Sequence, residues 1–381
     1  AVVAVAAALL IAVVVVRNAF VAQFAEVRPQ RALAAWPGHP QAELWSGLTG
    51  IAAATRAGRP VSPATLAMLM DAARKSPLAA EPFLVRGVQG RLAGNESLAG
   101  KAFLAAELRD GRSVPARYFL ADHDLRSGDA RDGLRQIAVL ARMIPNGVVA
   151  LSPFVASYAQ DPRNWPQLRA LFQSNPNLGD SALSALAADP RNADLVLRLA
   201  PRTGAQGLWA NRLVQTLVTA GDYAKAGQVW RRVNDVSGPP GALIYDSGFT
   251  DATAPGPFNW TLTSSPLGLA ERRGGRLHVI YYGQDDGVLA SQLLLLEPGR
   301  YRLAMQATGD VAGLLSWTVT CADSSAQLLK LAVASRTDGS FTVPAGCTAQ
   351  RLELAGSAPE LPRTVDVTIG GLSLQREPAR G

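Results

Sequence analysis

The chain has 381 residues, a formal net charge of +7 at pH 7, 48% hydrophobic residues and 18% charged residues. This composition excludes a wholly disordered chain and supplies enough apolar side chains for the cores of two or three domains. The excess positive charge lies before residue 237, as arginines scattered singly among helical patterns. They either reflect composition alone or line a groove for an acidic partner. Without a nucleic-acid-binding motif, we expect no nucleic acid partner.

The first sixteen residues are apolar and uncharged, and Arg17 ends this stretch. Because the chain begins with Ala1 instead of Met, we expect further residues to precede it in the natural protein. With them the stretch reaches the roughly 20 apolar residues that span a bilayer as a helix. A cleaved signal peptide is the alternative, but no clear small-x-small cleavage site follows Arg17. The sequence therefore predicts a transmembrane anchor helix over residues 1–24.

Residues 25–236 show amphipathic helical patterns separated by proline and glycine. Gly94 and Gly128 are 34 residues apart, each at the turn of a helix–turn–helix pattern, and Gly221 marks a third such unit. These units resemble the tetratricopeptide repeat, in which small residues let two helices pack closely and an aromatic side chain fills the gap to the next hairpin. The resemblance implies an α-solenoid that binds a protein partner. Between residues 152 and 200 the pattern is weaker and indicates only a generic α-solenoid.

The composition changes at residues 237–242, which we predict to be an interdomain linker, and alternation of period two follows from residue 243 to residue 381. Leu277, Val279 and Tyr281 are expected to share one face of a strand. Repeated short strands of this kind predict an antiparallel β-sandwich. The two cysteines of the chain, Cys321 and Cys347, predict a disulfide in an oxidising compartment; two buried thiols in a cytosolic protein are the alternative.

Four segments of this region, 243–249, 275–279, 292–303 and 367–374, resemble the jelly-roll carbohydrate-binding modules of bacterial glycan-handling proteins. The resemblance implies a shallow sugar site with an exposed aromatic ring and polar groups for hydroxyls. Thr250 stands where that family usually has an acidic residue. The candidate carbohydrate-binding residues are Trp260, Tyr282, Gln284, Asp285 and Asp286. The alternative is structural: a core tryptophan, a strand tyrosine and an acidic turn.

No catalytic signature is present in the sequence. The three histidines, His39, His123 and His278, are far apart, and no Gly-rich phosphate loop, HExxH, GxSxG or Cys–His pattern occurs. The two cysteines have no histidine near them, which makes a poor metal site. We therefore predict a protein that is not an enzyme and has no metal and no cofactor.

Together these features predict a multidomain α + β chain: an N-terminal transmembrane helix, an α-solenoid of TPR-like hairpins and a C-terminal jelly roll. We expect a single-pass protein of the bacterial inner membrane with most of the chain in the periplasm. Its expected role is a scaffold whose repeats bind a protein partner and whose jelly roll binds a glycan or a protein, in envelope polysaccharide assembly or export. The alternative is a structural accessory subunit of a large inner-membrane complex with no glycan role.

Overall fold

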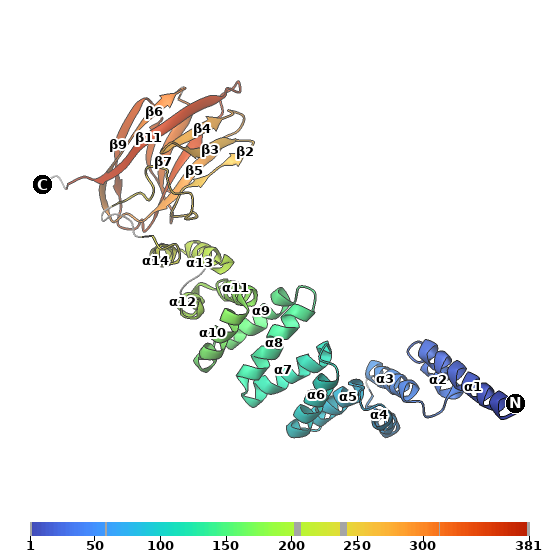
Figure 1. Cartoon of the computed structure of the whole chain (residues 1–381). Helices are drawn as coiled ribbons and strands as arrows, with labels where there is room; N and C mark the ends of the chain where they lie inside the picture. Colours follow the sequence, from blue (N-terminus) through green and yellow to red (C-terminus); the bar gives the residue numbers. More distant parts are fainter. Residues whose placement is uncertain (1, 58, 202–206, 237–241, 312, 379–381) are drawn as a thin grey trace. The chain divides into compact units, whose positions relative to one another are not determined.

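The structure is a computed structural model that describes residues 2–57, 59–201, 207–236, 242–311 and 313–378. Within them fourteen α-helices precede two antiparallel β-sheets, which confirms the predicted fold class (Figure 1). The chain divides into two compact units, Ala1–Gly179 and Asp180–Gly381. The predicted linker falls mainly on residues 237–241, outside the described residues. The compact unit that holds the sandwich begins well before this linker, at Asp180.

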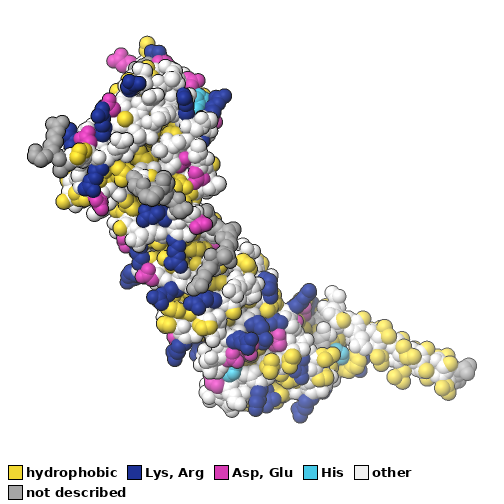
Figure 2. Space-filling view, turned by 60° about the vertical axis from the view of Figure 1, so that its left-hand side comes forward, with side chains coloured by type: hydrophobic (Ala, Val, Ile, Leu, Met, Phe, Trp, Pro, Cys, Tyr) yellow, Lys and Arg dark blue, Asp and Glu magenta, His cyan; other side chains and the backbone are white. Residues whose placement is uncertain are grey.

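The first unit begins with a helix that is apolar on all sides. Its described residues are nearly all exposed up to Phe20, and apolar side chains predominate on the face of this helix that Figure 2 shows. Val21 and Ala25 are buried against Ala32 and Ala42 of the next two helices. The helices of this unit are α1 (Val2–Phe24), α2 (Pro29–Ala35), α3 (Pro40–Arg56), α4 (Pro63–Lys75), α5 (Glu81–Leu92), α6 (Glu96–Arg109), α7 (Val114–Ser127), α8 (Ala130–Met143), α9 (Gly147–Tyr158), the 3₁₀ turn η1 (Pro162–Asn164) and α10 (Trp165–Ser174).

The helices α3 to α8 pair as hairpins, α3 with α4, α5 with α6 and α7 with α8. Capping side chains and glycines determine where these helices begin and end. The side chains of Asn95 and Asp129 accept hydrogen bonds from backbone N–H groups in the first turns of α6 and α8. Gly128 ends α7 with φ of +88°, a conformation that costs glycine little. A Cβ on Gly87 would lie 2.4 Å from the Phe103 ring, so the close packing of α5 on α6 requires glycine there. Gly87 is thus a small residue that lets the two helices pack closely, and the Phe103 ring stacks on Phe119 of the next hairpin, with ring centroids 5.1 Å apart.

The second unit begins with short helices. These are α11 (Pro176–Leu186), which spans the boundary of the units, η2 (Pro190–Asn192), α12 (Ala193–Leu199), α13 (Leu208–Thr219) and α14 (Tyr223–Val233). Asp189 caps η2 and holds the Arg191 guanidinium through both carboxylate oxygens. Asp161 and Arg163 repeat this arrangement at η1, so each of the two Asp-Pro dipeptides marks a helix start.

The sandwich consists of two stacked antiparallel sheets. The five-stranded sheet has the order β1 (Thr261–Leu262), β5 (Gly287–Leu294), β10 (Gln350–Gly356), β7 (Leu315–Cys321) and β8 (Gln327–Ala332). The six-stranded sheet has the order β2 (Ser264–Ser265), β3 (Gly268–Arg273), β4 (Arg276–Tyr281), β11 (Val365–Arg376), β6 (Gly299–Gly309) and β9 (Arg336–Val343). Leu277, Val279 and Tyr281 are fully buried between the sheets, as their alternation predicts.

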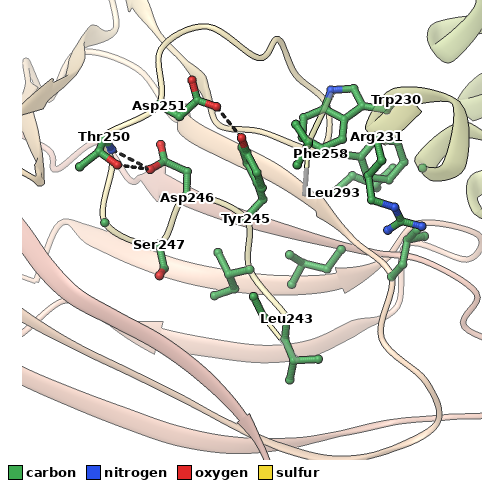
Figure 3. Close-up of a pocket in the computed structure, with 17 residues that line it drawn as sticks. Trp230, Arg231, Leu243, Tyr245, Asp246, Ser247, Thr250, Asp251, Phe258 and Leu293 are labelled. Carbon is green, nitrogen blue, oxygen red and sulfur yellow. Dashed lines mark hydrogen bonds between the residues drawn. The ribbon is translucent and has the colours of Figure 1, made fainter. Parts of the chain in front are cut away.

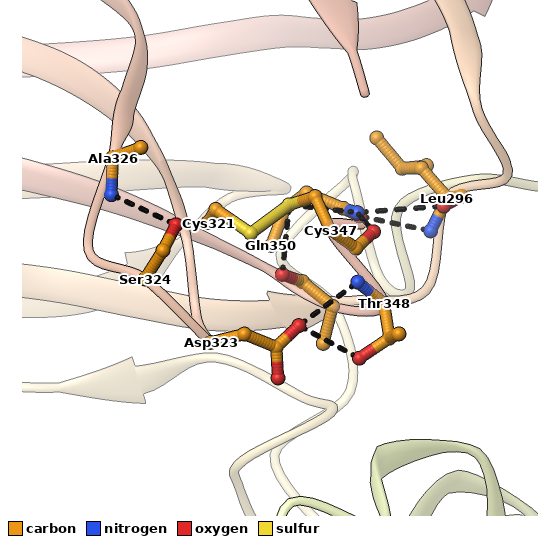
Figure 4. Close-up of a disulfide and its surroundings, with 9 residues drawn as sticks. Leu296, Cys321, Asp323, Ser324, Ala326, Cys347, Thr348 and Gln350 are labelled. Atoms are coloured by element: carbon orange, nitrogen blue, oxygen red, sulfur yellow. Dashed lines mark hydrogen bonds between the residues drawn. A yellow bond between two sulfur atoms is a disulfide. The ribbon is translucent and has the colours of Figure 1, made fainter. Parts of the chain in front are cut away.

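The predicted disulfide between Cys321 and Cys347 is confirmed, with the two Cα atoms 5.5 Å apart (Figure 4). It joins the end of β7 to the loop before β10. Asp323 accepts hydrogen bonds from the backbone N–H and the hydroxyl of Thr348, at 2.9 and 2.8 Å. The buried Gln350 side chain accepts a hydrogen bond from the Leu296 N–H at 2.9 Å. The disulfide therefore lies in a closely hydrogen-bonded end of the sandwich.

The last helix is part of the same compact unit as the sandwich. Trp230 of α14 is 3% exposed, and its ring centroid lies 5.0 Å from that of Tyr245 and 5.8 Å from that of Phe258. Its indole N–H donates to the carbonyl oxygen of Pro255 at 2.7 Å. A side chain at Gly227 would collide with Leu295, at 2.6 Å. These contacts explain why the compact unit includes helices before the predicted linker.

Candidate binding site at the loop end of the sandwich

Three loops meet at one end of the sandwich, and we call this the loop end: residues 282–286, 310–314 and 357–364, apart from the undescribed residue 312. The Ala358 N–H donates to the Asp286 carboxylate at 2.7 Å, which joins the first loop to the third. The Arg363 guanidinium donates to the Asp310 carboxylate at 2.8 Å, which joins the third loop to the second. The loops are therefore fixed against one another and form a preorganised surface.

Gly283 is a position where this arrangement requires glycine. Its φ is +68°, and a Cβ there would lie 2.4 Å from the carbonyl oxygen of Arg363. The neighbouring Tyr282 is held by its backbone, because its N–H donates to the carbonyl oxygen of Leu267 at 3.2 Å. The close approach of two loops and this hydrogen bond thus hold the backbone at Tyr282 in place.

Exposed apolar side chains gather at the loop end. Every exposed large hydrophobic residue in the described part of the sandwich, residues 243–378, lies in these loops or directly beside them: Tyr282, Val288, Val311 and Leu361. Leu361 is 82% exposed and the other three are 37–38% exposed. Exposed apolar residues that cluster in this way mark interaction surfaces, whereas single ones carry little meaning.

Four of the five predicted carbohydrate-binding residues lie in the first of these loops. Tyr282, Gln284, Asp285 and Asp286 are all exposed. Asp286 accepts the hydrogen bond from Ala358, and the Asp285 carbonyl oxygen accepts one from the Tyr281 hydroxyl at 2.9 Å. No pattern in the sequence indicated Val311 and Leu361, because single apolar residues in loops have no periodicity.

Trp260, the fifth predicted residue, lies elsewhere. Its side chain is 3% exposed and packs against Phe249 and Trp317, with ring centroids 5.1 and 5.7 Å apart. Its indole N–H donates to the carbonyl oxygen of Asp246 at 3.0 Å. This burial removes Trp260 from the candidate site, since no face of its ring is open to a ligand.

The outer faces of the sheets include polar and charged side chains that are exposed or half-buried. On the five-stranded sheet they include Thr318 and Arg351. On the six-stranded sheet His278 lies between two carboxylates, with Nδ1 3.1 Å from Glu271 and Nε2 2.9 Å from Asp366. Within the described part of the sandwich, neither outer face presents an exposed aromatic ring. A flat aromatic platform for a sugar is therefore missing from these faces.

A cavity of about 580 Å³ lies between α14 and the segment before β1 (Figure 3). The Tyr245 hydroxyl donates to Asp251 at 2.5 Å there. Burial and this bond raise the pKa of Tyr245 to about 12. The hydroxyls of Thr253 and Tyr245 lower the pKa of Asp251 to about 2. Asp246 accepts from the Thr250 N–H at 2.6 Å. These polar groups of the cavity therefore bond to one another.

No cluster of three or more His, Cys, Asp or Glu side chains in the described parts of the chain is arranged to hold a metal ion. His123 lies in α7, with its Nδ1 3.3 Å from Glu96, and His278 lies in the six-stranded sheet. His39 precedes α3, and burial lowers its pKa. The three histidines thus lie in separate surroundings.

No family profile and no curated protein matches the sequence. Among solved structures, one described as "CBM4 structure and function" is 11% identical, with a TM-score of 0.29, and covers 35% of this chain and 99% of its own. Yeast Tom70 is 17% identical, with a TM-score of 0.28, and covers 55% of this chain and 45% of its own. The structure described as "MamA RS-1 ArsTM double mutant" is 18% identical, with a TM-score of 0.24. The match covers 51% of this chain and 93% of the MamA chain.

Proposed function

We propose that this chain is a membrane-anchored, non-enzymatic adaptor that docks a protein partner at the loop end of its sandwich. One observation carries the proposal: the exposed large apolar side chains of the sandwich gather in loops that hydrogen bonds hold in place. Apolar side chains fixed in position lose little conformational entropy on binding, which favours a specific protein contact.

The N-terminal helix supplies the anchor. Residues Val3–Phe24 form a 22-residue segment that contains an 18-residue window with a mean hydropathy of 2.4, so the segment is long and apolar enough to cross a membrane. At 1.5 Å per residue the segment is about 33 Å long, and the hydrocarbon core of a bilayer is about 30 Å thick. A signal sequence would have the same length and composition, and fractionation of the mature protein separates the two.

The disulfide favours a periplasmic location for the sandwich. Disulfides persist in oxidising compartments and are rare in the cytosol. Cys321 and Cys347 form one in the sandwich, on the C-terminal side of the candidate membrane-spanning helix Val3–Phe24. An inner-membrane protein with its C-terminal part in the periplasm satisfies both observations. The helical hairpins add a second surface for protein partners, as stacked hairpins commonly do.

Glycan binding is the second candidate function, and Tyr282 is the observation in its favour. Tyr282 has the one exposed aromatic ring in the described sandwich, and the side chains of Gln284 and Asp285 in its loop are exposed beside it. An aromatic face with neighbouring polar groups is the combination that sugar binding needs. If the sandwich binds a glycan, the chain would act in envelope polysaccharide assembly or export. If it docks a protein instead, the chain would be an adaptor or accessory subunit of an inner-membrane complex without a glycan role.

Purification of the detergent-solubilised full chain from its native membranes tests the first function. We expect a membrane protein to co-purify at fixed stoichiometry with the wild type and to be lost from Leu361→Asp. Thr342→Asp is the matched control, because Thr342 is exposed on β9 away from the loop end. Equal recovery with both variants, or no stoichiometric partner, contradicts docking at this site.

Affinity electrophoresis in gels that contain envelope polysaccharide tests the second function. Sugar binding predicts that polysaccharide retards the wild type and that Tyr282→Ala abolishes the retardation. Tyr118→Ala is the control, because Tyr118 of α7 is also exposed, at 58%. Identical mobility of the wild type with and without polysaccharide removes the glycan role.

A further inference from the structure

A groove in the first unit lies between α8 and α10 and is separate from the loop end. Its volume is about 670 Å³, and thirteen residues of the two helices and the adjoining turn line it. Leu134 and Ala138 of α8 and Leu171 of α10 form buried parts of its wall, and Val139 and Ala170 are more accessible. The groove therefore offers apolar surface to a ligand.

Three arginines of α8 form a stripe along one side of this groove. Arg131, Arg135 and Arg142 stand at positions i, i+4 and i+11 of the helix. At 100° per residue these positions fall within about 40° of one another around the helix axis. At 1.5 Å per residue they extend over about 16 Å. The stripe is long enough to meet three successive turns of a bound helix.

The positive charge of the stripe is largely uncompensated. Asp132 is the one acidic residue of the groove lining, and it pairs with Arg135 at 3.1 Å. Arg142 donates to the neutral Asn175 side chain at 3.3 Å. Among the described residues Arg131 has no hydrogen-bonding or ion-pair partner through its side chain. An occupant that supplies carboxylates opposite these guanidinium groups would complete the ion pairs.

We propose that the α8–α10 groove binds an amphipathic helical segment of a protein partner whose Glu or Asp side chains meet Arg131, Arg135 and Arg142. The apolar wall decides between this occupant and an anionic polysaccharide, because sugar hydroxyls would have few polar groups to meet at Leu134, Ala138, Val139 and Ala170. A helix with acidic side chains along one edge and small apolar side chains beside them would pair with the three arginines and pack against the apolar wall of the groove. The inference deepens the adaptor function and rests on it.

The probe is a fluorescein-labelled helical peptide with Glu at positions i, i+4 and i+11 and with Ala and Leu on the adjacent face. Its control is the same peptide with Lys at the three Glu positions. Fluorescence anisotropy with the full chain in detergent measures both affinities, at low and at high salt. We expect the acidic peptide to bind and the Lys peptide not to bind, with affinity falling as salt rises.

The double variant Arg131→Glu/Arg142→Glu is expected to weaken peptide binding about tenfold or more, since each reversal replaces an attraction by a repulsion of similar size. Arg86→Glu/Arg112→Glu is the matched control, because both residues are exposed outside the groove and the charge change is equal. Ala170→Trp, which fills the groove without changing the charge, is expected to weaken binding as well. Circular dichroism verifies that each variant keeps its helix content.

Equal binding of the two peptides, or equal affinity of the groove and control variants, overturns the inference. Tight binding of a polyuronate that the groove variant loses, with no peptide binding, assigns the groove to an anionic polysaccharide instead. The failure of the adaptor function is distinguishable from these results. If the partner from native membranes co-purifies equally with Arg131→Glu/Arg142→Glu and with the wild type, the groove inference fails and the adaptor function stands. If neither the wild type nor any variant retains a partner, the adaptor function fails.

Discussion

Replacement of Trp230 by alanine tests whether the last helical hairpin and the sandwich unfold as one unit. The Trp230 side chain is 3% exposed and contacts Tyr245 and Phe258, which belong to the segment that leads into the sandwich. Its indole N–H donates to the Pro255 carbonyl oxygen at 2.7 Å. The substitution removes the ring from a packed site and leaves that carbonyl oxygen without its partner.

The expected loss of stability is large. Truncation of a buried aromatic side chain to alanine costs about 3–5 kcal/mol, which includes the cavity that remains. The unpaired Pro255 carbonyl oxygen adds about 1 kcal/mol. We therefore expect Trp230→Ala to lower the free energy of unfolding of this unit by about 4 kcal/mol or more. Trp230→Phe is the matched control, since it keeps a ring and loses the hydrogen bond, at a cost nearer to 1–2 kcal/mol.

Urea denaturation of the full chain measures the loss, and hydrogen exchange locates it. In Trp230→Ala we expect amide exchange to accelerate together in α14 and in β5, because the helix packs beside the end of this strand. Faster exchange in α14 with unchanged exchange in β5 would show that the hairpin and the sandwich are independent. A loss of less than about 1 kcal/mol would refute the packing argument itself.

Three further predictions concern the disulfide, the anchor and the response to pH. Replacement of Cys321 and Cys347 by serine opens a loop closed over a sequence separation of 26 residues, which should cost about 3.5 kcal/mol in the chain-entropy model; an unchanged urea midpoint when the wild type is reduced would contradict this. Ile11→Arg places a charge in the apolar helix at a cost of about 2.5–3.5 kcal/mol and should release the protein from carbonate-washed membranes; retention in the membrane fraction would refute the anchor. Because the pKa of Asp251 falls from 3.8 to about 2 on folding, its contribution to stability is present above pH 3.8 and is lost as the pH falls toward 2. Asp251→Asn should therefore lose less stability than the wild type over this interval, and identical acid unfolding curves would disprove the role of this carboxylate. The pKa of Tyr245 rises from 10 to about 12, so its contribution is lost as the pH rises through that interval, and Tyr245→Phe should flatten this alkaline slope.

Local patterns in the sequence predicted the elements of the fold. The apolar run at the N-terminus, the glycines of the hairpin turns and the alternation in β4 each act within a few residues, so they are readable without tertiary information. Leu277, Val279 and Tyr281 are buried as their spacing required. The disulfide was predictable because the chain has two cysteines in one β-rich region.

Long-range packing determined which candidate site residues are buried and which are exposed, and local sequence patterns do not report this. Trp260 and Tyr282 were both candidates for sugar stacking, and their surroundings in the fold separate them: Phe249 and Trp317 enclose the first, whereas a loop held at Gly283 exposes the second. Helix α14 belongs to the second unit because Trp230 contacts residues that follow the linker. Local sequence patterns cannot predict contacts of this kind. Leu361 was missed because its exposure follows from the loop connections around Asp286 and Arg363.

Site-specific photo-crosslinking in intact membranes tests the central claim most directly. A benzoylphenylalanine residue would replace Leu361 at the loop end in one protein and Thr342 on β9 in another. The adaptor function predicts a discrete crosslinked product with one protein from position 361 and none from position 342. No product from position 361, or the same set of products from both positions, would contradict docking at the loop end.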